Sequence, residues 1–529
     1  MTRSAIAAVD QRQFDVIVVG AGANGSSAAQ HLAALGFDVL IVDKGDFASG
    51  TSSRSSRLLH CGLQYLVQET PLAGASRLSS YLRRPFDILA SLAAARRTMH
   101  CRTQLVRETP ERVRPVTFFY PVYENSHYPA WKIKLAFRIL ASFGSRAVPL
   151  EFKEVAGAPA RALPFVRLLA QPDRLRSVAI FREYQYDWAE RICLDAVLDA
   201  ERMGATIRNY TSVKALSHRP DASRAWHVVL EDGLEPGAQA HVTAHVLLNI
   251  AGPWVDRVNS LTKTAVERRV IGVKGINVLL KFPDECAGFG LECLNSLGQA
   301  YYAMPWGPYH FIGPTATVYE GDPDDVRPSE EEIGFLIAET NRLFPTFNLR
   351  RSDVIYAWAG VRARTHVSGA EVRRRASTIH DLAADGMPDA FALTETPIML
   401  HRSAGAELAR RVARTRKPSG KPMQLSFLPP QLPASSSVPP INSRIPTLTL
   451  ASLRHAAATE HVVNLIDLLF RRVNLGWGDD MGTSLAHDAA RAVSDILGWD
   501  EMRIALEVER YRAYLVEHFL PSRMEVVTK

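Results

Sequence analysis

Three glycines and one aspartate near the start of the chain have the spacing of a dinucleotide-binding site. Gly20, Gly22 and Gly25 form a Gly-x-Gly-x-x-Gly turn directly after the apolar run 14–19, and Asp43 closes the next apolar run. Glycines in this pattern allow a tight turn, the approach of a pyrophosphate and close packing of helix on strand. The helix N-terminus favours the anion, and the carboxylate can accept hydrogen bonds from a ribose 2′-OH. The alternative is a glycine-rich turn in an ordinary βαβ unit.

The serine- and arginine-rich loop that follows indicates which dinucleotide is bound. Residues 51–66, TSSRSSRLLHCGLQYL, resemble the flavin-contacting segment TSS-x-SSKL-x-HGGLRYL of the FAD-dependent glycerol-3-phosphate dehydrogenases. Two-domain flavoenzymes also begin with the ADP-binding βαβ unit, which favours FAD over NAD here. The sequence is identified as a divergent member of that family, of the aerobic, flavin-containing type.

Further family segments recur in the same order along the chain. Residues 249–255, NIAGPWV, are similar to N-A-x-G-P-W-V, where a strand end passes close to the FAD. Residues 304–306, 311–313 and 319–323 resemble the IPW, IIG and Y-x-GDP segments, and WAGVR at 358–362 resembles SGVRP. The resemblance implies non-covalent FAD, no metal, and these cofactor-binding residues: Gly20, Gly22, Asn24, Gly25, Asp43, Thr51, Ser52, Ser53, Ser56, Arg57, Gly62, Val213, Ala251, Gly252 and Trp254.

The order of these motifs predicts an α/β fold with a discontinuous, Rossmann-like FAD-binding domain. Residues 14–68, 181–265 and 355–412 are expected to form that domain. Residues 69–180 and 266–354 are expected to form a substrate or cap domain with an antiparallel sheet. A helix is predicted over 191–203, and strands are predicted at 204–208, 227–231, 240–249, 276–280 and 300–304.

The last part of the chain is expected to be helical and separate. Residues 413–446 are rich in Pro and Ser with little periodicity, which predicts a linker, either a mobile tether or an ordered loop. A C-terminal helical domain, 447–529, is expected to carry helices over 457–473, 484–497 and 501–519. Its segment FRRVNLG at 470–476 resembles the family's W-R-R-T-x-x-G.

The chemistry that the resemblance implies is transfer of a hydride from a carbinol carbon to flavin N5, while a base takes the hydroxyl proton. His60 is the candidate base because imidazole titrates near neutral pH, with a structural hydrogen-bonding role as the alternative. Arg362, after a strand predicted at 354–360, is the candidate clamp for a substrate oxyanion or phosphate, because its guanidinium is a rigid donor fork. A surface arginine is the alternative there.

Departures from the family concern the groups that would hold a phosphate. Gln64 stands where the family has arginine, Cys61 replaces its first glycine, and Ala316 replaces the acid of IIGTTD. Residues 395–402, ETPIMLHR, align with G-G-K-L-T-T-Y-R, so that Pro397 replaces the lysine. A helix can still start there, with Thr396 as N-cap and Pro397 in the first position.

Losing two cations weakens the binding of glycerol 3-phosphate. Each charge-assisted contact is typically worth about 1.5 to 3 kcal/mol, so two of them correspond to roughly 10²- to 10⁴-fold in affinity. We therefore expect glycerol 3-phosphate to be a poor substrate unless another cation substitutes. The candidates are Arg54, Arg57, Arg364 and His401.

Composition agrees with a packed enzyme of two to four domains, since 529 residues include 47% hydrophobic and 22% charged ones. The five cysteines contain no C-x-x-C pair, so neither a disulfide framework nor a zinc site is expected, and a reducing cytosol fits. The first 13 residues contain no apolar signal region. No window approaches the roughly 20 apolar residues of a spanning helix, so no membrane crossing is expected.

The net charge of +7 suits nucleic acid, an anionic membrane surface or an anionic substrate. No nucleic-acid-binding module is recognisable, so nucleic acid is not expected. Residues 77–84 and 131–140 mix basic, aromatic and aliphatic side chains as interfacial helices do. The alternative is packed helices whose cations reach water. We expect a cytoplasmic protein, with peripheral contact to the inner face of the cytoplasmic membrane left open.

Together these patterns predict an FAD-dependent dehydrogenase that oxidises the secondary alcohol of a small polyol phosphate and passes electrons to a quinone or oxygen. Two alternatives stay open. One is a sister flavoenzyme acting on a different polyol, a hydroxy acid or an amine. The other is a flavin-binding paralogue with little turnover, which the loss of Gly-Gly-Lys makes plausible.

Overall fold

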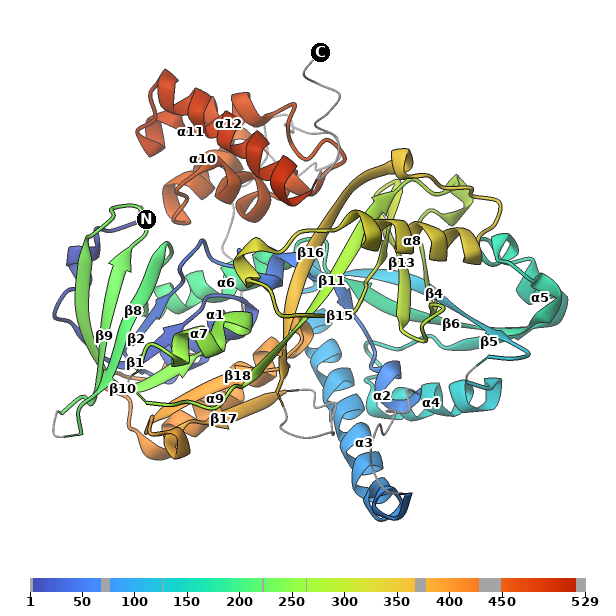
Figure 1. Ribbon diagram of the computed structural model, residues 1–529, viewed down its shortest axis with the longest axis horizontal. Helices are drawn as coiled ribbons and strands as arrows, with labels where there is room; N and C mark the ends of the chain where they lie inside the picture. Colours follow the sequence, from blue (N-terminus) through green and yellow to red (C-terminus); the bar gives the residue numbers. More distant parts are fainter. Residues whose placement is uncertain are drawn as a thin grey trace. The chain divides into compact units, whose positions relative to one another are not determined.

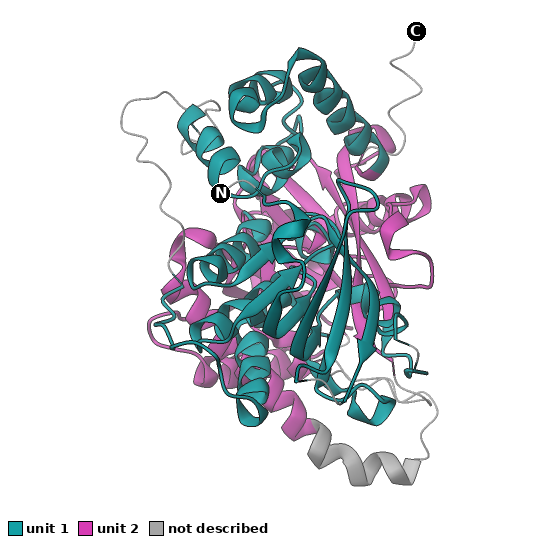
Figure 2. Ribbon diagram, turned by 90° about the vertical axis from the view of Figure 1, so that its left-hand side faces the viewer, with its two compact units in different colours: residues 1–53, 188–270, 377–517 teal, residues 54–187, 271–376, 518–529 magenta. Residues whose placement is uncertain are grey.

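Each of the two units of this protein is built from separate stretches of the chain. The computed structural model describes residues 3–67, 77–126, 128–220, 223–262, 264–366, 377–427 and 449–519, without the side chains of 77–87. The first unit contains residues 1–53, 188–270 and 377–517, and the second contains 54–187, 271–376 and 518–529 (Figure 2). Both units are therefore discontinuous in sequence.

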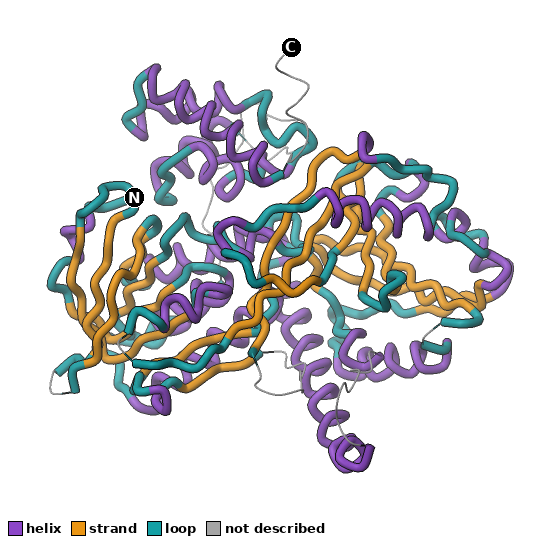
Figure 3. The backbone as a smooth tube through the Cα atoms, viewed as in Figure 1, coloured by secondary structure: helices purple, strands orange, loops and turns teal. Residues whose placement is uncertain are grey.

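The first unit is built on an eight-stranded sheet with the strand order β17-β18-β10-β1-β2-β7, extended by β9 and β8 from β10 (Figures 1 and 3). The strands β18, β10, β1, β2 and β7 are parallel to their neighbours in that order. In β1 every residue after the first is buried, and β2 is buried throughout, because helices cover a parallel sheet on its faces. The strands are β1 (Gln13–Val19), β2 (Val39–Val42), β7 (Thr206–Arg208), β8 (Thr211–His218), β9 (Trp226–Asp232), β10 (Gln239–Asn249), β17 (Thr378–Asp381) and β18 (Ala390–Thr394).

Helices of the same unit bury this sheet. Leu32 of α1, Val197 of α6 and Leu408 of α9 share one apolar core with Val18 and Leu248 of the central strands. The parallel strands and covering helices confirm the α/β, Rossmann-like architecture. The helices are α1 (Ala23–Ala34), α6 (Ala189–Arg202), α7 (Val255–Asn259) and α9 (His401–Thr415), followed by α10 (Leu450–Thr459), α11 (Ala486–Leu497) and α12 (Glu501–His518) in the C-terminal helical part.

The second unit is built on a ten-stranded sheet ordered β15-β11-β14-β13-β12-β4-β6-β3, with β16 beside β11 and β5 beside β6. Neighbouring strands such as β4 and β6 or β13 and β14 are antiparallel, as predicted, but β12 and β4 are parallel. The strands are β3 (Leu58–Leu59), β4 (Arg114–Tyr123), β5 (Lys153–Ala156), β6 (Leu175–Gln185), β11 (Val270–Leu280), β12 (Phe289–Leu294), β13 (Ala300–Trp306), β14 (Tyr309–Gly313), β15 (Thr317–Tyr319) and β16 (Val354–Thr365). The helices are α2 (Leu63–Val67), α3 (Arg77–Glu108), α4 (Ala130–Phe143), α5 (Gly157–Arg161) and α8 (Glu330–Leu343).

Strand β16 corrects the predicted boundary of the FAD-binding domain at residue 355. It pairs with β11 in the sheet of the second unit, and Ala357 and Ala359 lie in the core of that unit. The strand also continues to Thr365 rather than ending at 360, so Arg362 lies within it. Small residues let this stretch fit into a packed core, and a single sequence does not reveal which sheet receives it.

The helix predicted over 457–473 is two segments. Helix α10 ends at Thr459, and a π-helical turn covers Asp467–Arg472. The Asp467 carboxylate accepts hydrogen bonds from the N–H groups of Val463 at 3.0 Å and Asn464 at 3.3 Å, which fixes the start of the second segment. The C-terminal helices up to residue 517 also group with the first unit instead of forming a unit of their own.

The first part of the predicted linker 413–446 packs against the first unit. Helix α9 continues to Thr415. Beyond it, Ser419 donates to Asp15 Oδ2 from its N–H at 3.0 Å and its hydroxyl at 2.7 Å, and Met423 N–H donates to the Ala34 carbonyl at 2.8 Å. Residues 428–448 lie outside the described residues.

Within the described parts of the chain, no helix combines the length and apolarity that crossing a membrane requires. The same residues contain no group of three or more His, Cys, Asp or Glu side chains arranged for a metal ion. All five cysteines are buried free thiols.

Candidate functional site

The glycine turn lies between β1 and α1 in the first unit. Gly20 has a φ of +101°, and a Cβ on it would stand 2.6 Å from the Ile250 carbonyl oxygen. A Cβ on Gly25 would stand 1.8 Å from the Gly20 carbonyl oxygen, and one on Gly22 would stand 3.0 Å from Ser52 Oγ. Only glycine fits at Gly20 and Gly25. The bare backbone at the N-terminus of α1 is the arrangement that accommodates a pyrophosphate.

Asp43 holds this turn from the end of β2. Its Oδ2 accepts a hydrogen bond from Ala21 N–H at 2.7 Å, and its Oδ1 accepts one from Gly45 N–H at 3.0 Å. Burial raises the pKa of Asp43 to about 6, although both N–H donors lower it. Each carboxylate oxygen can accept a second bond, so a ribose hydroxyl can still be received. Val213 lies in β8 two residues after Thr211, whose N–H donates to the Asp43 carbonyl at 2.7 Å.

The loop 51–53 supports the same turn through its hydroxyl groups. Thr51, Ser52 and Ser53 lie in a short 3₁₀ turn. Ser52 Oγ accepts a hydrogen bond from Ala23 N–H at 3.0 Å, and Ser53 Oγ donates to the Gly50 carbonyl at 2.9 Å. The Ser52 hydroxyl therefore satisfies one of the N–H groups at the start of α1, the function of a helix cap.

Ala251, Gly252 and Trp254 follow β10, and Trp254 contacts the residue after Asp43. Gly252 has a φ of +59° and starts a 3₁₀ turn, Gly252–Trp254. Lys44 Nζ lies 4.3 Å from the centre of the Trp254 ring. Trp254 Nε1 and the side-chain oxygen of Asn24 are buried and have no hydrogen-bond partner among the described residues. A bound polar ligand would satisfy such atoms.

The segment before α9 differs from the predicted helix start. Thr396 is not an N-cap, since its hydroxyl donates to the Thr394 carbonyl at 3.2 Å, and Pro397 is extended at φ −66° and ψ 153°. A 3₁₀ turn, Ile398–Leu400, comes first, and α9 begins at His401. Burial lowers the pKa of His401 to about 3. His401 is therefore neutral near pH 7 and does not replace the cation missing at Pro397.

In the second unit, His60 lies between β3 and α2. The Gln64 amide nitrogen is 3.1 Å from His60 Nε2, and because an amide nitrogen only donates, Nε2 accepts and Nδ1 carries the proton. His60 Nδ1 is buried without a partner among the described residues. Burial lowers the pKa of His60 to about 4, so the ring is neutral near pH 7. Gly62 has a φ of +92° and leads the chain into α2. A Cβ on Gly62 would stand 3.2 Å from the Thr98 side chain.

Ser56 and Arg57 make contacts inside the second unit. Ser56 Oγ donates to Asn277 Oδ1 at 3.4 Å. The Arg57 side chain is buried, donates to the Asp187 carbonyl at 3.3 Å, and stacks on the Trp306 ring at 5.2 Å. The role of Arg57 as a replacement for the missing phosphate ligands stays a prediction.

Two buried acids beneath the His60 loop were not predicted from the sequence. Glu183 Oε1 accepts a hydrogen bond from Cys61 N–H at 2.8 Å. Burial raises the pKa of Glu183 to about 7, although Arg102, 3.9 Å away, lowers it. Burial and then the nearby Glu183 raise the pKa of Glu292 to about 8. The sequence feature that could have indicated these buried acids is the single acid within each of the strands β6 and β12.

Arg362 lies in β16 with an exposed side chain, and Arg364 is half-buried two positions later. Alternate residues of a strand point to the same face, so the two guanidinium groups share one face of β16. A Cβ on Gly360 would stand 2.7 Å from Arg54 Cβ, so only glycine lets this strand pass the backbone at residue 54.

The predicted residues thus fall into two groups, one in each unit. The first unit brings together the glycine turn, Asn24, Asp43, loop 51–53 and residues 251–254. The second unit contains Ser56, Arg57, His60, Gly62 and Arg362.

Comparison with known proteins gives a family match over most of the chain. The FAD dependent oxidoreductase family matches residues 15–409. A glycerol-3-phosphate dehydrogenase of Synechocystis sp. is 26% identical, over 97% of this chain and 98% of its own. Glycerol-3-phosphate dehydrogenase 2 of Mycobacterium tuberculosis is 26% identical over 95% of this chain and 88% of its own.

Solved structures show the same fold. The glycerol-3-phosphate dehydrogenase of Bacillus halodurans, complexed with FAD, superposes with a TM-score of 0.72 over 97% of this chain and 96% of its own, at 17% identity. The FAD-bound L-alpha-glycerophosphate oxidase of Mycoplasma pneumoniae gives 0.56 over 79% of this chain and 98% of its own, at 15% identity.

The residues of the first unit fit the ADP half of FAD. Gly20, Gly22 and Gly25 leave no side chain where a pyrophosphate approaches, and Asp43 retains acceptor capacity for a ribose. The unpaired Trp254 Nε1 supplies a further donor.

Proposed function

The chain belongs to the family of FAD-dependent oxidoreductases, and from this premise we propose that it oxidises the secondary alcohol of a small polyol phosphate. The observation that carries the proposal is the similarity to a glycerol-3-phosphate dehydrogenase over nearly the whole length of both chains. Bound FAD supplies the acceptor for the hydride.

We propose His60 as the base for the substrate hydroxyl. Its neutral ring has a lone pair at Nε2, which the Gln64 amide holds in place until a substrate hydroxyl takes that position. A pKa near 4 makes His60 a weak base when the site is free. An anionic substrate beside it would raise that pKa, because a negative charge stabilises the imidazolium. The reaction therefore favours phosphorylated substrates over neutral ones.

We propose that β16 supplies the phosphate or oxyanion ligands. Arg362 and Arg364 share a face of this strand. A guanidinium presents a planar donor fork that matches phosphate. His401, which is neutral, does not offer that charge. Arg362 is proposed to stabilise the alkoxide character that develops in the transition state.

A sister activity on a different polyol, a hydroxy acid or an amine is the second candidate, favoured by Gln64 and Pro397. The test is to purify the protein with its FAD and to follow the visible absorbance of the oxidised flavin without oxygen while adding candidate substrates. Bleaching by glycerol 3-phosphate, ahead of glycerol, supports the polyol phosphate. Bleaching by a hydroxy acid or an amine alone supports the second candidate, and no bleaching by any substrate leaves a flavin-binding paralogue.

We propose that the electron acceptor is a quinone or oxygen, and that the protein reaches a quinone by peripheral contact with a membrane. Helix α4 buries Ile133 and Phe137 and leaves Trp131 67% and Leu135 49% exposed, with Arg138 exposed nearby. This combination suits an anionic lipid surface. Cosedimentation with anionic vesicles tests it, and equal binding of Trp131→Ala would contradict it.

A further inference from the structure

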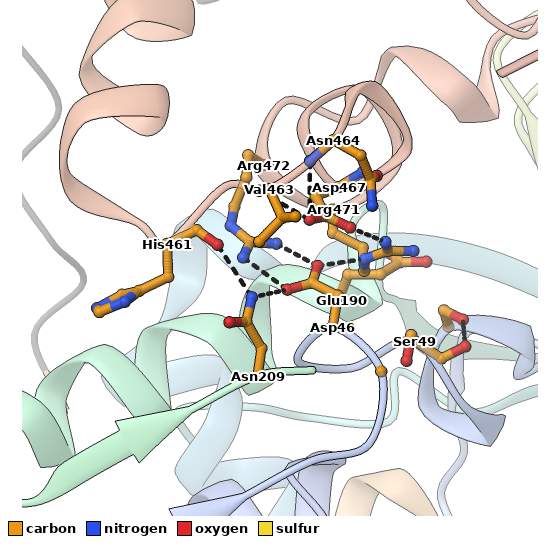
Figure 4. A network of polar contacts seen from close by, with 12 residues as sticks. Asp46, Ser49, Glu190, Asn209, His461, Val463, Asn464, Asp467, Arg471 and Arg472 are labelled. Atoms are coloured by element: carbon orange, nitrogen blue, oxygen red, sulfur yellow. Dashed lines mark hydrogen bonds and ion pairs between the residues drawn. The ribbon is translucent and has the colours of Figure 1, made fainter. Parts of the chain in front are cut away.

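A buried charge network joins the C-terminal helical part to the loop after β2 within the first unit (Figure 4). Arg472 donates to both oxygens of Asp46, at 2.6 and 2.9 Å, and Arg471 Nε donates to Asp46 Oδ2 at 2.5 Å. Asn209 donates from one side-chain nitrogen to Asp46 Oδ1 at 3.0 Å and to the His461 carbonyl at 2.9 Å. Asp46, Arg471 and Arg472 are all buried.

The two arginines come from the π-helical turn Asp467–Arg472. Asp467 accepts hydrogen bonds from Arg471 at 2.5 Å and from the Tyr210 hydroxyl at 2.6 Å. The π-helical turn is therefore also fixed by contacts that do not involve Asp46. Burial alone would raise the pKa of Asp46, but Arg472 and Arg471 outweigh it and hold that pKa well below its usual range. Asp46 therefore stays ionised, and the geometry around it is set by paired charges rather than by shape alone.

Asp46 belongs to the loop that shapes the nucleotide site. The Asp46 carbonyl accepts from Ser49 N–H at 3.1 Å, and Ala48 N–H donates to the Ala21 carbonyl, inside the glycine turn, at 3.0 Å. Further along the same loop, Ser52 caps α1. A shift of Asp46 would therefore move the groups that hold the glycine turn.

A second buried ion pair joins the C-terminal helical part to α6 rather than to the loop after β2. Arg191 of α6 donates to both oxygens of Glu460, at 2.7 and 2.8 Å, and also to Asp195 at 2.6 Å. Asp46 and Glu460 are thus both buried carboxylates that accept two hydrogen bonds from the guanidinium group of one arginine. The Glu460 carbonyl accepts a hydrogen bond from Arg472 Nε at 2.9 Å, and Glu460→Gln retains that bond. Of the two acids, only Asp46 belongs to the loop that contacts the glycine turn.

From this difference we propose that Arg471 and Arg472 are positioning residues for FAD. By holding Asp46 they keep residues 43–53 in the arrangement that binds the dinucleotide, and FAD in turn favours docking of the C-terminal helices. Such coupling between two sites is reciprocal and typically amounts to 5- to 150-fold in affinity. The inference depends on FAD binding and not on the identity of the substrate.

The test compares two isosteric neutral substitutions, Asp46→Asn and Glu460→Gln. FAD is removed from each purified protein, and its dissociation constant is measured by fluorescence during titration back. Asp46→Asn is expected to weaken FAD at least about tenfold, within the usual range of coupling, and Glu460→Gln less than about twofold. Both variants are expected to lower the melting temperature of the FAD-free protein. Equal FAD affinities in the two variants would overturn the proposal, because both would then act on stability alone.

Arg472→Lys provides a milder variant if Asp46→Asn does not fold. An ammonium cannot donate to both carboxylate oxygens as the guanidinium does, so an intermediate loss of FAD affinity is expected. Hydrogen exchange gives the reciprocal readout. FAD should slow exchange in residues 450–472 of the native protein and of Glu460→Gln, and much less in Arg472→Lys. Unchanged FAD affinity together with unchanged protection in Arg472→Lys would refute the coupling.

Discussion

Asp46 in the first unit and Glu292 in the second are both buried carboxylates, but their surroundings shift their pKa values in opposite directions. Two arginines surround Asp46 and hold its pKa below the usual range. Burial and the neighbouring Glu183 raise the pKa of Glu292 to about 8, and its hydrogen-bond contact with the Tyr302 hydroxyl is long, at 3.5 Å. Near the nucleotide turn, the paired arginines keep Asp46 ionised and hold it in place. Among the described residues of the second unit, Glu292 has no such cation and can gain or lose a proton near neutral pH.

The same contrast separates the two groups of site residues. In the first unit the decisive constraint is steric, because the backbone at Gly20 and Gly25 excludes any side chain. In the second unit the candidate chemistry depends on the ionisation and donors of His60, Gln64 and Arg362. Substitutions of the glycines in the first unit should therefore abolish FAD binding, and those of the candidate residues in the second should change rates or pH dependence.

The largest effect is expected for Gly22→Val. A side chain at this position stands against Ser52 Oγ and in the path of the pyrophosphate, so the protein should fold but bind no FAD. The flavin absorbance of the purified protein measures this. Gly334→Val is the control, because a Cβ on Gly334 would meet nothing within 4 Å. Retention of stoichiometric FAD in Gly22→Val would show that steric exclusion is not decisive there.

Arg362→Ala should lower kcat/KM at least about 10²-fold while FAD content stays unchanged, because a preorganised donor to the developing negative charge is lost. Arg362→Lys should recover only part, since an ammonium lacks the planar fork. Steady-state kinetics on the true substrate measure both. Arg351→Ala, which removes a partly exposed arginine paired with Glu330 in the same unit, is the control. Near-native activity of Arg362→Ala would make Arg362 a structural residue.

A smaller gain is expected for Gln64→Arg with glycerol 3-phosphate. One added charge-assisted contact is worth about 1.5 to 3 kcal/mol, so kcat/KM should rise on the order of tenfold or more, mainly through KM. Turnover of unphosphorylated glycerol should not rise with it. A native KM in the micromolar range for glycerol 3-phosphate, or an equal gain with glycerol, would mean that Gln64 does not limit phosphate binding.

The smallest effect is a change in the pH dependence of stability in Glu292→Gln. Because the pKa of Glu292 is raised to about 8 from an ordinary value of 4.5, the folded protein holds more protons than the unfolded chain between these pH values. The free energy of unfolding therefore falls as pH rises through this window, and glutamine removes that fall.

Urea unfolding at pH 5 and pH 9 measures this difference. We compare the free energy of unfolding of Glu292→Gln with that of the native protein at each pH. This difference should favour the variant more at pH 9 than at pH 5, by on the order of 1 to 3 kcal/mol. Glu330→Gln, at an exposed acid, should show no such gain. The same stability difference at both pH values would mean that Glu292 does not carry a proton into the folded state.

Local patterns predicted the parts of this protein that depend on neighbours in sequence. The glycine turn, the apolar strands β1 and β10, and helix α6 follow from spacing and periodicity within a few tens of residues. The family segments made the FAD-dependent oxidoreductase class predictable, and the comparisons confirm it. The proposed roles of His60 and Arg362 stay predictions.

Features that depend on distant partners were missed. Nothing local distinguishes Glu183 and Glu292 from acids on a solvent-facing strand, because their burial results from β6 and β12 lying in the middle of a ten-stranded sheet. Arg471 and Arg472 belong to the segment that resembles W-R-R-T-x-x-G, but nothing in that segment indicates that their partner is Asp46. Strand β16 was assigned to the other unit because its pairing with β11 has no signature in its own residues.

The pairing of Asp46 with Arg471 and Arg472 also bears on how the protein is made. These partners are 425 and 426 residues apart in the chain, so Asp46 leaves the ribosome long before either arginine exists. Bringing such distant segments together is slow, because the entropy of closing the intervening loop must be overcome first. The nucleotide loop can thus reach its final form only near the end of synthesis. A nascent or truncated chain that ends before residue 471 lacks both arginines, so its Asp46 has neither of the charged partners that it has in the folded protein.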